Sequence, residues 1–111
     1  MKVRVWTVAE ADAQADAADD WWRLHREVAP DVFLTELRGA LNMLAIVPEV
    51  GRPYVHRRVQ GVRRMLLPRT QYHVYYVYDA TAAEVAVIAI WSARRRRGPR
   101  LRAVRSSPGE Q

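Results

Sequence analysis

The sequence predicts an α+β fold in which a helical hairpin packs on one face of a small antiparallel sheet, with elements in the order β-α-α-β-β-β. Residues 2–7 alternate polar and apolar side chains, as in a strand with one buried face. Residues 8–47 hold two stretches with apolar residues at helical spacing. After Gly51 the apolar period returns to two in three short runs. The apolar faces of the two helices and of the sheet can bury one another in a two-layer domain.

The opening strand is expected to lead directly into the first helix. Thr7 and Glu10 have the spacing of a capping box, which predicts that the helix begins beside them. The apolar stripe of this helix consists mainly of small residues, so a neighbour can pack closely against it: Ala11, Ala15, Ala18 and Trp22.

The second helix is expected between Pro30 and Pro48, because each proline breaks the helical pattern. Its leucines recur at steps of three and four residues, at positions 34, 37, 41 and 44. Since only a short break separates the two helices, they should form an antiparallel hairpin.

The second half of the chain is expected to form an antiparallel meander. Its β-rich runs are residues 62–67, 72–78 and 85–91, joined by connections short enough for hairpins. In the last run, strict alternation sets Val85, Val87, Ala89 and Trp91 against Ala86, Ile88 and Ile90. Both faces are therefore apolar, which indicates a central strand.

Length and composition place the chain among ordinary globular proteins. Its 111 residues are enough for one domain, expected over residues 1–97, followed by a basic tail over 98–111 whose Gly, Pro and Ser content predicts disorder. The absence of cysteine excludes disulfides and cysteine-ligated zinc, and three scattered histidines predict no metal site or cofactor. Without a long apolar run, the protein is expected to be cytoplasmic, with no membrane partner.

Charge is distributed unevenly along the chain. Residues 1–51 contain five Lys/Arg against nine Asp/Glu, residues 52–93 contain six against two, and residues 94–111 contain seven against one. A basic second half fits nucleic acid or an acidic partner. A solvated surface with no specific role accounts for the same charge equally well.

Candidate functional residues are few when judged by chemistry alone. No acid/base pair of side chains is apparent, and His73 among tyrosines fits a structural histidine better than a general base. Trp21 and Trp22 cannot both face the core, so one indole should be exposed. Such an indole either marks a protein-binding patch or stacks on the chain that enters Pro30. The run Arg94–Arg97 has the character of a phosphate clamp without sequence-reading geometry.

Four motifs occur in order along the chain: "PEVGRPY", "GVRR", "YHVYY" and "WSARRRRGP". Together they resemble the RelE/ParE family of bacterial type II toxin–antitoxin toxins over about residues 2–101. The family fold implied by this resemblance, two helices on an antiparallel sheet, agrees with the periodicity. The RelE branch implies a ribosome-dependent messenger RNA endonuclease, whereas studied members of the ParE branch poison DNA gyrase by stabilising its cleaved DNA complex.

The residues that the resemblance assigns to RNA cleavage are mostly missing. Arg64 stands at one catalytic lysine position, but Leu66 stands at the second. His73 replaces an expected arginine, Ala93 replaces the basic residue after the last strand, and no tyrosine follows Tyr78. One position of five matches, so no catalytic residue is assigned and the chain is closer to the ParE branch.

The resemblance therefore implies the toxin component of a type II system, ParE-like, that inhibits gyrase by binding and is neutralised by a cognate antitoxin. Two departures lie near the expected target-binding end: Ser92 follows Trp91 where relatives have histidine, and Arg96 stands where glycine is common. The alternatives are a RelE-like ribonuclease and a non-toxic homologue that serves mainly as antitoxin ligand.

The binding surfaces expected from this interpretation comprise two sets of residues. The target-binding basic surface, with possible nucleic-acid contact through the target complex, comprises Arg63, Arg64, Arg69, Arg94, Arg95, Arg96 and Arg97. The antitoxin-binding set comprises Trp21, Trp22 and Arg52. The antitoxin should fold on binding, with apolar anchors on the helical hairpin and carboxylates against Arg52, Arg63 or Arg64 of the sheet half.

Overall fold

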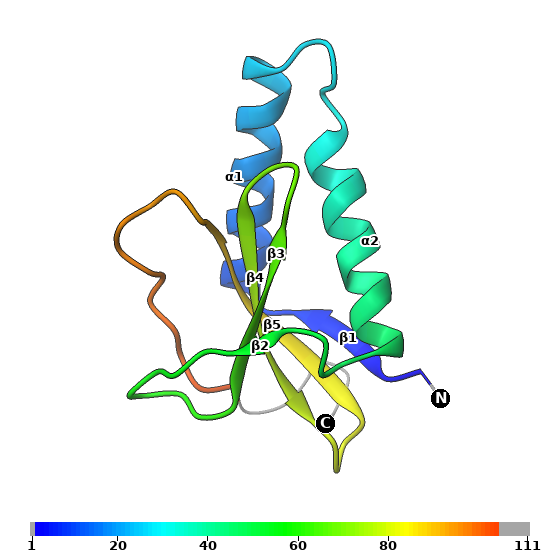
Figure 1. The fold of residues 1–111 in the computed structure, drawn as a ribbon, viewed down its shortest axis with the longest axis vertical. Helices are drawn as coiled ribbons and strands as arrows, with labels where there is room; N and C mark the ends of the chain where they lie inside the picture. The colour runs from blue at the N-terminus through cyan, green and yellow to red at the C-terminus, as the bar shows by residue number, and fades with distance from the viewer. Residues whose placement is uncertain (1, 105–111) are drawn as a thin grey trace.

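The computed structural model describes residues 2–104, and it confirms the α+β fold with two helices packed on a sheet (Figure 1). The helices are α1 (Ala9–His25) and α2 (Val32–Ile46). The strands are β1 (Arg4–Thr7), β2 (Arg52–Pro53), β3 (Val62–Leu67), β4 (Tyr72–Asp79) and β5 (Glu84–Ser92). The two-residue strand β2, within the "PEVGRPY" motif, is an addition to the expected order.

Within the described residues, the five strands form one sheet in the order β1-β5-β4-β3-β2. The expected meander of β3, β4 and β5 is confirmed as antiparallel. The sheet as a whole is mixed, because β1 pairs in parallel with β5. The amide of Val8 extends this pairing by donating to the carbonyl of Val87 at 3.0 Å. With β1 on one side and β4 on the other, β5 is central, as its two apolar faces predict.

The helices lie side by side on one face of the sheet and form the main core with it (Figure 1). Helix α1 contributes the small residues of its stripe, which lets it approach β5 closely. Helix α2 contributes the larger groups. Buried members of this core include Ala11, Ala18, Phe33, Leu37, Leu44, Val74, Tyr76, Val85 and Val87.

The predicted capping box is wrong. Helix α1 starts at Ala9, the N-cap is Val8, and the cap makes no side-chain hydrogen bond. Thr7 is the last residue of β1, and its hydroxyl donates to the carboxylate of Asp12 instead. Thr7 pairs with Val87 of β5 and stands one residue before the N-cap, so its side chain is not at the capping position.

The predicted division of β5 between the two faces is correct as far as Ile88. Tyr76 of β4 pairs with Val87, whereas Tyr75 pairs with Ala89, so Ile88 is an extra residue in a β-bulge. Beyond the bulge the alternation is shifted by one. Ile90 therefore packs in the helix-side core, and Ala89 and Trp91 face the other side.

A second core covers the sheet face that points away from the helices. It consists of sheet residues together with Val59, from the β2–β3 connection, and Leu101, from the segment after β5. Leu101 is only 5% exposed and Pro99 is also buried. Pro99 and Leu101, which lie in the segment expected from composition to be a tail, therefore pack on this face, while Arg100 and Arg102 beside them are exposed. Residues 105–111, the rest of the expected tail, lie outside the described residues.

Helix α2 also fixes the turn between β3 and β4. The Glu36 carboxylate accepts hydrogen bonds from the amides of Arg69 (2.7 Å) and Thr70 (2.9 Å) and from the Thr70 hydroxyl (2.7 Å). This carboxylate therefore serves the fold.

Neither α1 nor α2 has the length and apolar content that crossing a bilayer requires.

Candidate functional site

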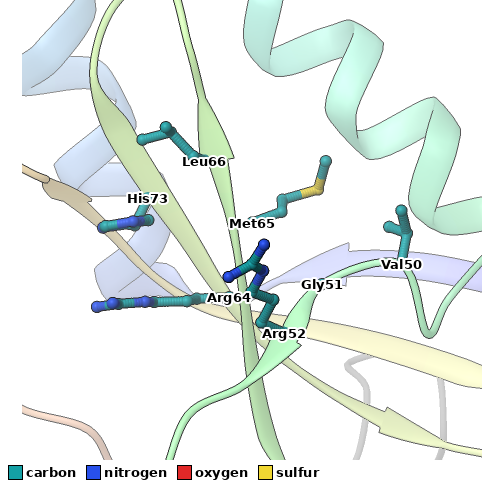
Figure 2. Close-up of a pocket in the computed structure, with 7 residues that line it drawn as sticks. All are labelled: Val50, Gly51, Arg52, Arg64, Met65, Leu66 and His73. Atoms are coloured by element: carbon teal, nitrogen blue, oxygen red, sulfur yellow. The ribbon is translucent and has the colours of Figure 1, made fainter.

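An open pocket, which we call the β3-edge pocket, lies where the short strand β2 ends and leaves the edge of β3 uncovered. Strand β2 pairs only with Arg63 and Arg64, so the edge of β3 continues beyond it. The pocket has a volume of about 400 Å³ and is lined by Val50, Gly51, Arg52, Arg64, Met65, Leu66 and His73. Figure 2 shows Met65 pointing toward α2, while Arg64 and His73 point the other way. The pocket thus lies between the segment that follows α2 and the basic face of the sheet.

Arg64 is held in place by two tyrosines. Its guanidinium carbon lies 4.9 Å from the ring centroid of Tyr54 and 6.0 Å from that of Tyr75. One guanidinium nitrogen also donates to the Tyr75 hydroxyl at 3.4 Å. Cation–π contacts orient the group without neutralising it. Arg64 therefore presents an oriented positive charge to the pocket.

His73 lies beside Arg64 on the same face. The strand register places it between Leu66 of β3 and Trp91 of β5. Partial burial, and then the positive charge of Arg64, lowers the pKa of His73 below its ordinary value of 6.5. The imidazole is therefore neutral at pH 7 and does not add to the positive charge of the pocket.

The pocket can bind an anion, but it offers little for catalysis. None of its seven lining residues is a carboxylate or carries a lysine amine. Leu66, at a position where the resemblance expects a catalytic lysine, is 42% exposed and cannot stabilise an oxyanion. Ala93 uses its backbone amide to bond Gln71 and has no functional side chain. None of the other residues that line the pocket therefore replaces the four unmatched RNA-cleavage groups.

Arg63 and Arg69 do not join Arg64 in one surface. Arg63 faces the helix side, where its guanidinium donates to the carbonyls of Gly51 (2.7 Å) and Glu49 (3.2 Å) and lies 3.8 Å from the Glu49 carboxylate. This arginine holds the segment after α2. Arg69 lies on the turn that Glu36 fixes, and it is exposed. The predicted target-binding set is therefore divided among several parts of the molecule.

The run Arg94–Arg97 follows β5 and is exposed throughout. Trp91 anchors it, because its indole nitrogen donates to the carbonyl of Arg97 at 2.7 Å and the Arg95 guanidinium lies 4.2 Å from its ring centroid. Ser92 contributes as well, since its hydroxyl accepts from the amide of Arg94 at 3.2 Å. The run therefore has a defined backbone path.

The two tryptophans of α1 differ in exposure. Trp22 packs against the helix-side core, while Trp21 is 42% exposed and stacks on His25 with ring centroids 4.3 Å apart. Trp21 also borders a hollow of about 190 Å³ between α1 and the end of β5, where Trp91 and Arg95 lie. Arg52, the third predicted antitoxin residue, pairs with Arg64 across β2 and β3.

A second basic hollow involves residues that sequence reasoning did not single out. The β2–β3 connection and the segment after β5 bring together Arg57, Arg58, Arg97, Arg100 and Arg102, of which only Arg97 was expected in a site. No local signal identifies this cluster, since its two halves are distant in the chain and meet only through the second core.

Comparison with known proteins identifies the family. Residues 8–97 match the family described as the ParE toxin of the type II toxin–antitoxin system parDE. Among curated proteins, no relative matches the sequence.

Solved structures share the fold at low sequence identity. The chromosomal ParDE system of Pseudomonas aeruginosa matches at 18% identity and a TM-score of 0.61, covering 84% of this chain and 98% of the other. The RelBE2 toxin–antitoxin complex of Mycobacterium tuberculosis matches at 16% and 0.59, covering 83% and 99%. A double mutant of Escherichia coli RelE in the free state matches at 15% and 0.52, covering 85% and 86%.

Because the family model spans most of the domain, from the start of α1 to the end of the arginine run, the chain belongs to the ParE family of type II toxin–antitoxin toxins.

Proposed function

We propose that this protein is a toxin that acts by binding, with DNA gyrase as its target. The observation that carries the proposal is the composition of the β3-edge pocket in a ParE-family chain. The pocket holds one oriented guanidinium, that of Arg64, beside a neutral histidine and the exposed Leu66. Such a site attracts an anionic group but lacks the paired proton donors and acceptors that RNA cleavage requires. Membership of the ParE branch supports gyrase as the target.

We further propose that a cognate antitoxin neutralises the toxin. The matched structures from Pseudomonas and Mycobacterium are described as toxin–antitoxin systems, which supports a partner of this kind. Two apolar surfaces suit it. One is the hollow beside Trp21, and the other is a row of exposed apolar residues that runs from the end of α2 to the β3-edge pocket: Met43, Ile46, Val47 and Val50.

The charge distribution favours a peptide that crosses from the helices to the sheet. Apolar anchors would seat along α2, and carboxylates would follow at Arg52 and Arg64, which face each other in the β2–β3 pair. A segment that folds on binding pays an ordering cost, so a few buried anchors should supply most of the affinity.

The proposal is tested by inducing the gene with and without the neighbouring antitoxin gene. Growth arrest, an SOS response and cleaved gyrase–DNA complexes are expected without the antitoxin. With purified protein, inhibition of gyrase supercoiling should follow toxin concentration. Codon-dependent cleavage of messenger RNA on ribosomes, abolished by Arg64→Ala, would contradict the proposal and indicate a ribonuclease instead. Induction without any growth defect would indicate a non-toxic antitoxin ligand.

A further inference from the structure

The second basic hollow, which we call the arginine groove, is larger than the β3-edge pocket. It has a volume of about 510 Å³ and lies between the β2–β3 connection and the segment after β5. In Figure 1 this segment, drawn in orange, leaves the sheet and returns toward the green β2–β3 connection. The polar groups of the groove are His56, Arg57, Arg58, Arg97, Arg100 and Arg102.

Both walls of the arginine groove are fixed to the body of the protein. Val59 and Leu101 are each 5% exposed and belong to the second core, so the arginines beside them stand on anchored backbone. Within the connection, His56 Nδ1 accepts from the amides of Arg58 and Val59, both at 3.2 Å. Because Nδ1 accepts these two bonds, Nε2 is the ring nitrogen that can donate to a ligand.

Within residues 2–104, no side chain of the protein neutralises the positive charge of the groove. Across residues 2–104, none of the five guanidinium groups of the groove makes an ion pair or a side-chain hydrogen bond. The lining of the groove contains no acidic residue. Five cations gathered in one hollow repel one another, so an anionic ligand that neutralises several at once gains affinity from their proximity.

We propose that the arginine groove binds the phosphodiester backbone of duplex DNA. Guanidinium groups donate in a planar fork that matches phosphate oxygens. An acidic peptide fits less well, because the apolar residues of the groove, Pro99 and Leu101, are buried and offer no anchor pocket. A single strand fits less well too, because no Trp, Tyr or Phe lines the groove to stack on bases.

In the cell, the contact between the arginine groove and DNA rests on the proposed function, since gyrase would bring the toxin to DNA. Binding of purified protein to DNA requires no gyrase. The groove is also separate from the β3-edge pocket, with which it shares no lining residue. A toxin with both surfaces would hold the enzyme and its DNA at the same time.

The test measures binding of the full chain to a fluorescent duplex DNA by anisotropy over a range of salt concentrations, without gyrase or antitoxin. Each phosphate contact contributes about 0.9 to the slope of log K against log salt. The Arg57→Ala/Arg58→Ala variant should therefore lower the slope by about 1.8, and adding Arg100→Ala and Arg102→Ala by about 3.6 in total.

The matched control for the double variant is Lys2→Ala/Arg38→Ala, which also removes two positive charges, but from exposed positions outside the groove. It should leave the slope nearly unchanged, and circular dichroism should show all variants folded. Equal slopes for the groove variant and the control would overturn the proposal.

Three further probes, duplex RNA, poly-L-glutamate and single-stranded DNA, identify the ligand class. Duplex RNA of equal length that competes like duplex DNA would support recognition of the phosphodiester backbone, whereas no competition by RNA would restrict the site to the DNA helix. If poly-L-glutamate displaces DNA at equal charge concentration, the proposal is overturned in favour of an acidic protein partner. If single-stranded DNA binds more tightly than duplex DNA, the assignment of a duplex ligand is overturned. Because gyrase is absent, failure here leaves the supercoiling assay as an independent test of the proposed function.

Discussion

The backbone amide of Gly51 donates a hydrogen bond to the hydroxyl of Tyr76 at 2.8 Å. This bond joins the segment that follows α2 to the middle of β4, in the buried layer between helices and sheet. Tyr76 is fully buried, and burial raises the pKa of its hydroxyl above the ordinary value. Since Gly51 immediately precedes Arg52, the bond also sets the position of β2 and hence one wall of the β3-edge pocket.

Tyr76→Phe should destabilise the protein by about 1–3 kcal/mol, because the buried amide of Gly51 loses its partner while the ring remains. The matched control is Tyr78→Phe on the same face of the same strand, where the hydroxyl makes no hydrogen bond within residues 2–104. Urea unfolding of both variants measures the difference. Equal stability losses would mean that the Gly51 bond adds nothing.

Gly51→Ala should destabilise the protein because the site has no room for a methyl group. A Cβ on Gly51 would lie 2.6 Å from the Tyr76 hydroxyl oxygen and 2.9 Å from the carbonyl oxygen of Arg64. Gly39→Ala is the control, since a Cβ there meets nothing within 4 Å in the exposed part of α2. Alanine at this helical position should stabilise by about 0.5–1 kcal/mol. Thermal unfolding of the pair should therefore shift in opposite directions, and a shift in the same direction would contradict this account.

His73 should titrate below the ordinary histidine pKa of about 6.5. Burial and Arg64 disfavour its charged form, so the unfolded chain binds a proton at a higher pH than the folded protein does. The stability that the neutral ring confers is therefore present above about pH 6.5 and is lost as the pH falls through the folded pKa. His73→Gln should reduce this acid sensitivity in urea unfolding.

The contribution of Arg64 to this shift can be isolated by NMR titration of the His73 ring. Arg64→Ala should raise the midpoint, because a nearby positive charge is removed, whereas Arg38→Ala on α2 should not move it. If both variants leave the midpoint in place, burial alone accounts for the shift and the two side chains are not coupled.

Periodicity predicted the two helices and the three long strands because their burial patterns are local properties of the chain. The bulge at Ile88 depends on how β4 and β5 register against each other, so strict alternation misplaced Ala89, Ile90 and Trp91. The parallel pairing of β1 with β5 likewise depends on where the helical hairpin returns the chain. Pairwise contacts between distant segments, not propensities, decide these features.

The candidate sites were harder to predict for the same reason. Arg63 and Arg64 are adjacent in sequence, yet strand alternation sends the first to Glu49 on the helix side and the second to the pocket. The arginine groove forms only because Val59 and Leu101 share the second core. Composition indicated a basic second half, but it could not divide that charge into separate surfaces.

Trp21→Ala should weaken antitoxin binding by about 2 kcal/mol or more and leave the fold intact. The indole is 42% exposed and borders the hollow between α1 and the end of β5, where a partner's apolar anchor could seat against it. Trp22→Ala is the contrasting variant, because that side chain packs in the helix-side core and its loss should mainly lower the thermal unfolding temperature. Isothermal titration with the cognate antitoxin, together with thermal unfolding of each variant, separates the two effects. If Trp21→Ala keeps its affinity within about threefold of wild type, a change of less than about 1 kcal/mol, the antitoxin does not use this hollow and the exposed row at the end of α2 is the surface to mutate next.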